Sequence, residues 1–173
     1  MKRFLELPYK EEDLLAIRCG DEVLISGYLY VGRDQVHKRL KEAIDKGAKL
    51  PFEFAHNGIY YMGPSPAPEG FAIGSAGPTT SARMDPFSPL LLEHSLRLMV
   101  GKGPRSEAVK EAIRKHKGVY LQAYGGCGAL YCSRIIASEP VAYEDLGPEA
   151  LIRLKVESFP AICMIDSEGN CLR

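Results

Sequence analysis

The stretch EVLISGYLYVGRDQVHKRLKEAID, residues 22–45, decides the fold class of this chain. Its first ten residues are rich in β-branched and aromatic side chains, which predicts a strand over residues 22–31. After a short break, apolar side chains recur at helical spacing to the end of the stretch. Asp34 is the expected N-cap of this helix and Gly47 its expected C-cap. A strand followed at once by a helix indicates an α/β or mixed α+β fold.

Strand and helix signals continue to alternate along the chain. Ser88 followed by Pro89 predicts the start of a helix that runs to residue 99, and Ser106 predicts the start of another. No repeat, low-complexity tract or linker interrupts the chain, so one domain over residues 1–173 is predicted. Further strands are expected at 58–62, 71–75, 119–123, 135–143 and 159–165, a further helix at 149–156, and tight turns at 125–128 and 166–170.

The composition is that of an ordinary globular protein. Of the 173 residues, 46% are hydrophobic and 25% charged, with 22 basic and 22 acidic side chains. A formal net charge of zero argues against general affinity for nucleic acid, which needs a basic surplus. The N-terminus lacks the apolar region of a signal peptide, and no apolar stretch approaches the ~20 residues of a membrane span. We therefore expect no membrane association and a cytoplasmic location.

The cysteines and histidines show no ligand spacing. Five cysteines at irregular intervals argue against a disulfide framework, and no C-x-x-C pair occurs. Cys127 and Cys132 are close in sequence, which is a weak metal signal, and we interpret the thiols as buried or idle. No metal site is predicted in this chain.

Three loops each join glycine or other small residues to a basic side chain. Arg33 follows the first strand beside a helix start, where backbone N–H groups and the helix dipole favour anions. Arg83 ends the loop GPTTSAR, whose hydroxyls include Thr79 and Thr80, and Lys102 lies between two glycines. Together the loops predict a site for a small dianion, because guanidinium groups bind carboxylates through paired, charge-assisted hydrogen bonds.

Each of these features also has a simpler explanation on its own. A lone basic residue in a loop is usually solvated, hydroxyls before an arginine can cap a turn, and Gly-Lys-Gly is common at helix ends. The loop Gly125–Gly128 could cradle a phosphate, but it matches neither phosphate-binding motif and is better explained by tight backbone packing. The pattern alone therefore indicates an anion site without naming a reaction or a substrate.

Four motifs carry a resemblance to a known family. They are Ser-Gly-x5-Arg-Asp-x-x-His-Lys-Arg (26–39), Gly-Pro-Thr-Thr-Ser-x-Arg-Met-Asp (77–85), Gly-Lys-Gly (101–103) and Lys-Val-Glu-x-Phe-Pro-Ala (155–161). In this order they resemble the β subunit of class I fumarate hydratase and L-tartrate dehydratase, which equals the C-terminal domain of the single-chain forms. The likeness spans nearly the whole chain, and the second motif is the most specific.

The resemblance implies a fold and an activity. The fold would be a swivelling, three-layer β/β/α domain. The reaction would be the reversible addition of water to fumarate, giving (S)-malate. A [4Fe-4S] cluster would be held by three cysteines of a partner α subunit, in an α2β2 assembly, so this chain would be inactive alone. The alternatives are the β subunit of L-tartrate dehydratase and a non-catalytic module that binds dicarboxylates.

The resemblance also implies roles for individual residues. Arg33, Arg83 and Lys102 would bind the substrate carboxylates, and Thr79 would act as the base at the neighbouring carbon. Thr80 could face the substrate in its place. A threonine hydroxyl is a poor base in water, so it would need nearby positive charge and an acidic group across the subunit interface. The histidine at position 37 is interpreted as a structural hydrogen-bonder rather than an acid–base group.

Overall fold

The computed structural model describes residues 1–63, 67, 69–70, 72–74, 76–124 and 128–173, which form one seven-stranded sheet with flanking helices. The sheet has the order β1-β2-β3-β4-β5-β7-β6. The elements are β1 (Lys2–Leu7), α1 (Glu11–Ala16), β2 (Glu22–Val31), α2 (Asp34–Asp45), β3 (Gly58–Tyr60), η1 (Ser81–Met84), α3 (Ser88–Glu93), β4 (Leu98–Gly101), α4 (Glu107–His116), β5 (Val119–Gln122), α5 (Gly128–Ser133), β6 (Ile135–Ala142), η2 (Glu144–Glu149) and β7 (Leu151–Ile165).

The last strand closes part of this sheet into a ring. Strands β1 to β5 pair with their neighbours in parallel, whereas β7 runs antiparallel to β2, β5 and β6. Because β7 pairs with both β2 and β5, the strands β2, β3, β4, β5 and β7 form a closed circuit of hydrogen-bonded neighbours. Closure removes the free edges that these strands would otherwise present to solvent.

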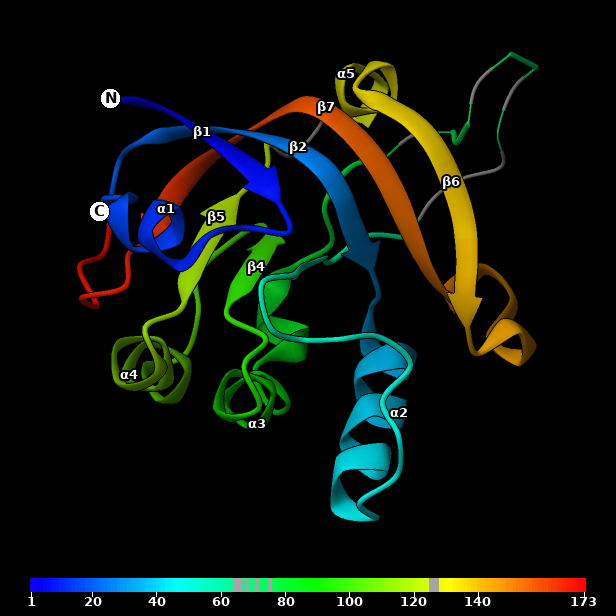
Figure 1. The fold of residues 1–173 in the computed structure, drawn as a ribbon, viewed down its shortest axis with the longest axis horizontal. Helices are drawn as coiled ribbons and strands as arrows, with labels where there is room; N and C mark the ends of the chain where they lie inside the picture. Colours follow the sequence, from blue (N-terminus) through cyan, green and yellow to red (C-terminus); the bar gives the residue numbers. More distant parts are fainter. Residues whose placement is uncertain (64–66, 68, 71, 75, 125–127) are drawn as a thin grey trace.

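Successive side chains of the parallel strands pack alternately into two separate hydrophobic cores. Tyr60, Val100 and Leu121 belong to the core that also holds side chains of β1, β2 and β7, whereas Ile59 and Met99 face the helices. The helices α2, α3 and α4 gather on that second side, and β1, β2, β7 and β6 run across the other side (Figure 1). Both faces of β3 to β5 are therefore buried, which is typical of strands in parallel sheets.

Most of the predicted elements are confirmed. The strand at 22–31 and the helix that follows it end where expected, and Gly47 adopts the left-handed conformation, with φ of 64°, just beyond the helix. Ser106 caps α4, since its hydroxyl accepts a hydrogen bond from the Val109 N–H at 3.3 Å. The predicted N-cap Asp34 is wrong. It is the first helical residue, and its carboxylate binds Arg83 instead of capping the helix.

One predicted helix is confirmed at its start but is too long, and another is wrong, because buried strands occupy these positions. The helix expected at 88–99 ends at Glu93, and its last residues begin β4. The segment 149–156 falls mostly within the 15-residue strand β7. Leu151 and Leu154 are three residues apart, as on one helix face, but they pack into the two different cores on opposite sides of the strand. A short apolar run that is buried on both faces cannot be told from a buried helix by its periodicity.

The remaining differences concern short segments. Residues 72–74 of the strand expected at 71–75 form bends, and residues 71 and 75 lie outside the described residues. Of the turn expected at 125–128, residues 125–127 also lie outside them, and Gly128 begins α5. The strand β1 and the helix α1 were not predicted at all.

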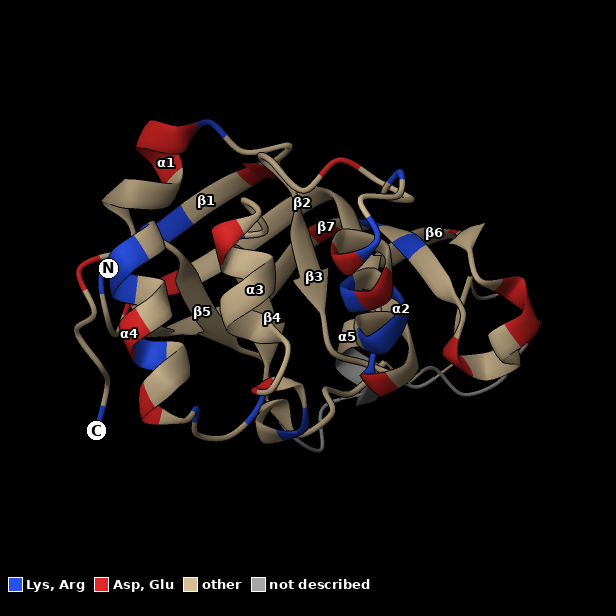
Figure 2. Ribbon diagram, turned by 90° about the horizontal axis from the view of Figure 1, so that it is seen from below, with Lys and Arg blue, Asp and Glu red and all other residues tan. Residues whose placement is uncertain are grey.

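Charge of both signs is present on two of the surface helices, whereas the charged residues of α1 are all acidic. Basic and acidic residues are interspersed along α2 and α4 (Figure 2). Within the part of the chain that the structure describes, no helix has the length and apolar character needed to cross a membrane.

Candidate functional site

The candidate residues follow the carboxyl ends of neighbouring parallel strands. Strands β2, β3 and β4 are parallel and adjacent, so their carboxyl ends meet at one edge of the sheet. Arg33 lies just beyond β2, Tyr61 continues β3, and Lys102 comes directly after β4. In α/β folds, both open sheets and closed barrels bind ligands at the carboxyl ends of their parallel strands. The topology therefore places two of the three predicted cations at the same edge of the sheet.

The loop with the threonine hydroxyls is fixed between β3 and β4. The Thr79 N–H donates to the Tyr61 carbonyl at 2.7 Å, and the Ser81 N–H donates to the Lys102 carbonyl at 2.8 Å. Thr80 forms an isolated parallel bridge with Lys102. These backbone contacts place Thr79 beside Tyr61 and Thr80 beside Lys102.

Gly101 allows the two segments to approach closely. A Cβ atom at this position would lie 2.0 Å from Ser81 Oγ and 2.6 Å from Tyr61 Cδ2, both far inside contact distance. The glycine stands at the end of a strand, so the alternative explanation of Gly-Lys-Gly as a helix end is wrong. Gly103 adopts φ of 84°, which favours glycine at the turn after the lysine.

Arg83 reaches the start of α2. Its Nη2 donates to Asp34 Oδ2, and its side chain is 53% exposed. Arg33, next to this aspartate, donates from Nη2 to Glu149 Oε1 at 3.3 Å, and its side chain is 29% exposed. Both candidate guanidinium groups thus hold a carboxylate of the chain itself.

A second glycine makes room for Arg33. A Cβ atom on Gly63 would lie 2.4 Å from Arg33 Nη1, so the guanidinium lies directly against the backbone that follows β3. Arg33 Nε and Asp34 Oδ1 are buried and have no hydrogen-bond partner. A buried donor and acceptor without partners are costly, and this pair marks the start of α2 as a place where a ligand or solvent could contribute.

The structure groups these residues through specific contacts. The backbone of the 79–81 loop contacts Lys102. Asp34, which follows Arg33 in the chain, binds Arg83. The roles of the candidate side chains toward a substrate remain predictions.

His37 is a buried hydrogen-bonder, as predicted. It is 0% exposed, and its Nδ1 lies 2.7 Å from the Arg33 carbonyl oxygen. Burial lowers the pKa of His37 to about 4, with a smaller contribution from the positive charge of Arg105. The neutral ring therefore donates from Nδ1 to the Arg33 carbonyl, which anchors the backbone next to the candidate guanidinium.

Sequence reasoning missed a buried ion pair behind the loops. The side chain of Arg105 is 0% exposed, and its Nε donates to Asp85 Oδ1 at 2.7 Å. Its Nη2 donates to Ser88 Oγ at 2.7 Å, and Asp85 Oδ2 accepts from the Ser106 N–H at 2.8 Å. Asp85 ends the second family motif and Arg105 follows the Gly-Lys-Gly turn, so their positions in the sequence were the available signal.

None of the four cysteines that the structure describes is in a disulfide. Of the cysteines that the structure describes, Cys19, Cys132, Cys163 and Cys171 are free thiols, and Cys127 lies outside the described residues. Burial raises the pKa of the Cys163 thiol. Within the described ranges, no three histidine, cysteine or acidic side chains gather into a group that could hold a metal ion.

Comparison with known proteins identifies the family. The family model described as "Fumarase C-terminus" matches residues 3–172. The chain belongs to this fumarase C-terminus family. The predicted resemblance is thereby confirmed, and the four motifs of the sequence fall within a match that covers almost every residue.

Three relatives illustrate the range of the family. The anaerobic class I fumarate hydratase of Escherichia coli K12 is 44% identical over 96% of this chain, and fumarate hydratase 2 of Leishmania major is 40% identical over 87% of it. The chain spans about a third of the length of these curated relatives, 31% and 27% respectively. The L(+)-tartrate dehydratase subunit beta of Escherichia coli K12 is 35% identical, and there the match covers 99% of this chain and 87% of the relative.

Proposed function

We propose that the chain is the β subunit of an iron–sulfur hydro-lyase that, with a cluster-bearing α subunit, adds water reversibly to fumarate and gives (S)-malate. The observation that carries the proposal is the gathering of Arg33, the threonine loop and Lys102 at one edge of the parallel sheet, with Arg83 tied to Asp34 beside them. The fumarate hydratase relatives support the reaction.

The finer form of the fold is part of this proposal. A closed circuit of five strands with helices gathered on one side supports the swivelling, three-layer domain that the resemblance implies. Such a domain would present its cation-bearing edge to the partner. A cytoplasmic location remains a prediction of the sequence.

In the proposed site, the cations of this chain bind and orient the substrate. Arg33, Arg83 and Lys102 would supply the positive charge that the two carboxylates of a small dicarboxylate need, and substrate carboxylates would take the places that Glu149 and Asp34 hold in the free chain. Thr79, or Thr80 in its place, would move the proton at the neighbouring carbon. Nearby positive charge and an acidic group of the partner would help it do so.

The proposed [4Fe-4S] cluster belongs to the α subunit. When bound, a cluster supplies a Lewis acid for the substrate hydroxyl and a carboxylate. The residues described in this chain contribute carboxylate binding and proton transfer instead, which is why it would be inactive alone. The relative that is described as a subunit beta supports a partner of this kind, and we propose an α2β2 assembly.

Arg83 gives the direct test of the site. The chain is co-expressed with its partner, the cluster is reconstituted without oxygen, and fumarate hydration is measured for wild type and for Arg83→Ala. Losing about 3 kcal/mol of charge-assisted hydrogen bonding should lower kcat/KM by roughly two orders of magnitude. Arg114→Ala is the matched control, because Arg114 is 58% exposed and also paired with a carboxylate, but lies on α4. Unchanged activity in Arg83→Ala would refute the site.

L-tartrate is the second candidate substrate. The tartrate dehydratase subunit matches this chain over most of both sequences, and the same cations suit any small dicarboxylic hydroxy acid. Comparing kcat/KM for malate and tartrate with one preparation decides between them. Tight binding of a dicarboxylate to the isolated chain, measured by calorimetry, would instead favour the non-catalytic module.

A further inference from the structure

Tyr120 connects two of the three loops of the candidate site. This residue of β5 faces the helices. Its hydroxyl oxygen lies within hydrogen-bond distance of two acceptors, Ser81 Oγ at 2.8 Å and the Gly103 carbonyl oxygen at 2.7 Å. Ser81 lies in the loop with the threonines, and Gly103 is the neighbour of Lys102. One phenolic oxygen therefore contacts two of the three segments that carry candidate residues.

The environment of Tyr120 holds this oxygen in place. The ring is 1% exposed, and the Arg105 guanidinium lies 4.9 Å from its centre. Asp85 and Ser88 hold that guanidinium in turn. Burial raises the pKa of Tyr120 to about 12, so the hydroxyl keeps its proton at neutral pH. The hydroxyl is thus a fixed donor on a rigid support.

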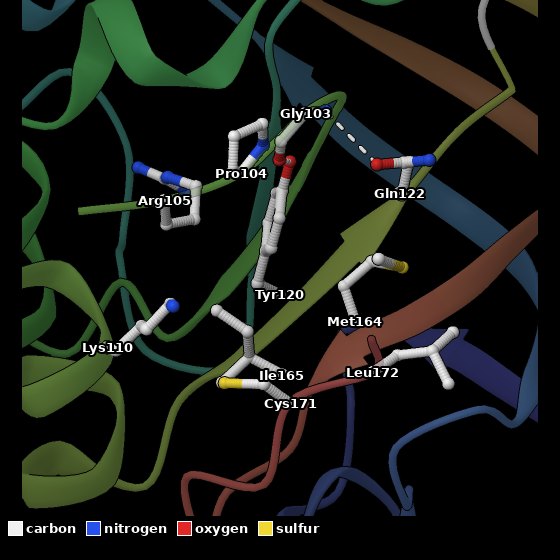
Figure 3. Close-up of a pocket in the computed structure, with 10 residues that line it drawn as sticks. All are labelled: Gly103, Pro104, Arg105, Lys110, Tyr120, Gln122, Met164, Ile165, Cys171 and Leu172. Carbon is white, nitrogen blue, oxygen red and sulfur yellow. Dashed lines mark hydrogen bonds between the residues drawn. The ribbon is translucent and has the colours of Figure 1, made fainter. Parts of the chain in front are cut away.

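The turn that carries Lys102 depends on β5 for its position. Figure 3 shows Tyr120 with its hydroxyl beside Gly103, and a dashed line from Gln122 to the same glycine. Gln122 Oε1 accepts from the Gly103 N–H at 3.1 Å. These residues line a pocket of about 260 Å³. Because this side of the turn faces a pocket rather than packed side chains, hydrogen bonds from β5 hold the turn on this side, and the 79–81 loop holds it through Lys102.

We propose that Tyr120 is a positioning residue whose hydroxyl sets the spacing between the loop of Thr79, Thr80 and Arg83 and the turn of Lys102. The inference rests on the proposed function and names a group that does not touch the substrate. Ser81 already lies in close contact with Gly101 at the start of the turn. The loop and the turn therefore cannot move closer together without a steric clash. Groups that bind two ends of one small molecule must keep their separation, because misplacement by about 1 Å is costly in rate.

The test removes the hydroxyl and keeps the ring. Tyr120→Phe is compared with wild type in complex with the partner, and Tyr9→Phe is the matched control because Tyr9 is equally buried but lies after β1. Amide hydrogen exchange is followed peptide by peptide, and kcat and KM are measured for fumarate and malate. We expect about tenfold faster exchange confined to residues 77–84 and 101–105, with KM raised about tenfold, as for the loss of one or two buried hydrogen bonds.

A second variant separates positioning from general stability. Ser81→Ala removes the other end of the contact and should reproduce the Tyr120→Phe result, and the double variant should add little to either. Faster exchange across the whole chain, or unchanged exchange in the two segments, would overturn the proposal. If the wild-type complex hydrates no dicarboxylate, the proposed function fails, and the exchange data still decide whether Tyr120 couples the loops.

Discussion

Acidification should destabilise the fold through His37. This imidazole is fully buried, and its folded-state pKa is lowered to about 4 from 6.5. A lowered folded-state pKa means that the unfolded chain binds the proton more tightly, so stability is intact above pH 6.5 and is lost as the pH falls toward 4. With about 1.4 kcal/mol for each pKa unit, the loss over this window is about 3 kcal/mol.

Urea unfolding between pH 7.5 and 4 measures this loss, with His37→Asn as the variant. Asparagine can keep a donor near the Arg33 carbonyl but does not titrate. It should be less stable than wild type at pH 7.5 because it leaves unfilled space, and the difference should shrink by about 3 kcal/mol by pH 4. His94→Asn is the control, because His94 makes the same contact with a carbonyl four residues earlier but is exposed. A difference between wild type and His37→Asn that does not vary with pH would refute the reasoning.

Two further substitutions test the site. Gly101→Ala should lower the free energy of unfolding by about 1–3 kcal/mol, because its methyl group would overlap Ser81 Oγ. Thermal unfolding measures the loss, and a stability equal to that of wild type would contradict the close approach. Glu149→Gln should lower KM for the dicarboxylate up to about fivefold, because it removes a carboxylate that competes for the Arg33 guanidinium, and a part-exposed pair is worth at most about 1 kcal/mol. A raised KM would show that this glutamate orients the arginine for binding instead.

The sequence predicted those parts of the fold whose signals are local. The strand at 22–31 and its helix were predicted from one continuous run of residues. Ser106 predicted the start of α4 and caps that helix. The strand β7 did not follow, because Leu151 and Leu154 are buried on opposite faces that only the complete sheet creates. Which residues are buried on both sides is a property of the tertiary structure and leaves no distinct periodicity.

The residues of the candidate site also fall into those that a local motif predicted and those that it did not. Arg33, Arg83 and Lys102 were found because each stands in a short motif with glycines or hydroxyls. Their partners within the chain were not found. Glu149 lies 116 residues from the arginine that it contacts, and only the folded chain brings the two together. Tyr120 carries no motif at all, and its importance appears only from the two atoms that its hydroxyl contacts.

The double pairing of β7 has a consequence for the order of synthesis. Every proposed ligand-binding residue lies between Arg33 and Lys102, and the ribosome completes this stretch well before it reaches Leu151. Until the final strand is made, β2 and β5 lack the neighbour that joins them, and the frame beneath the cations remains open. A nascent chain would therefore carry all of its proposed ligand-binding residues before it has the geometry to use them.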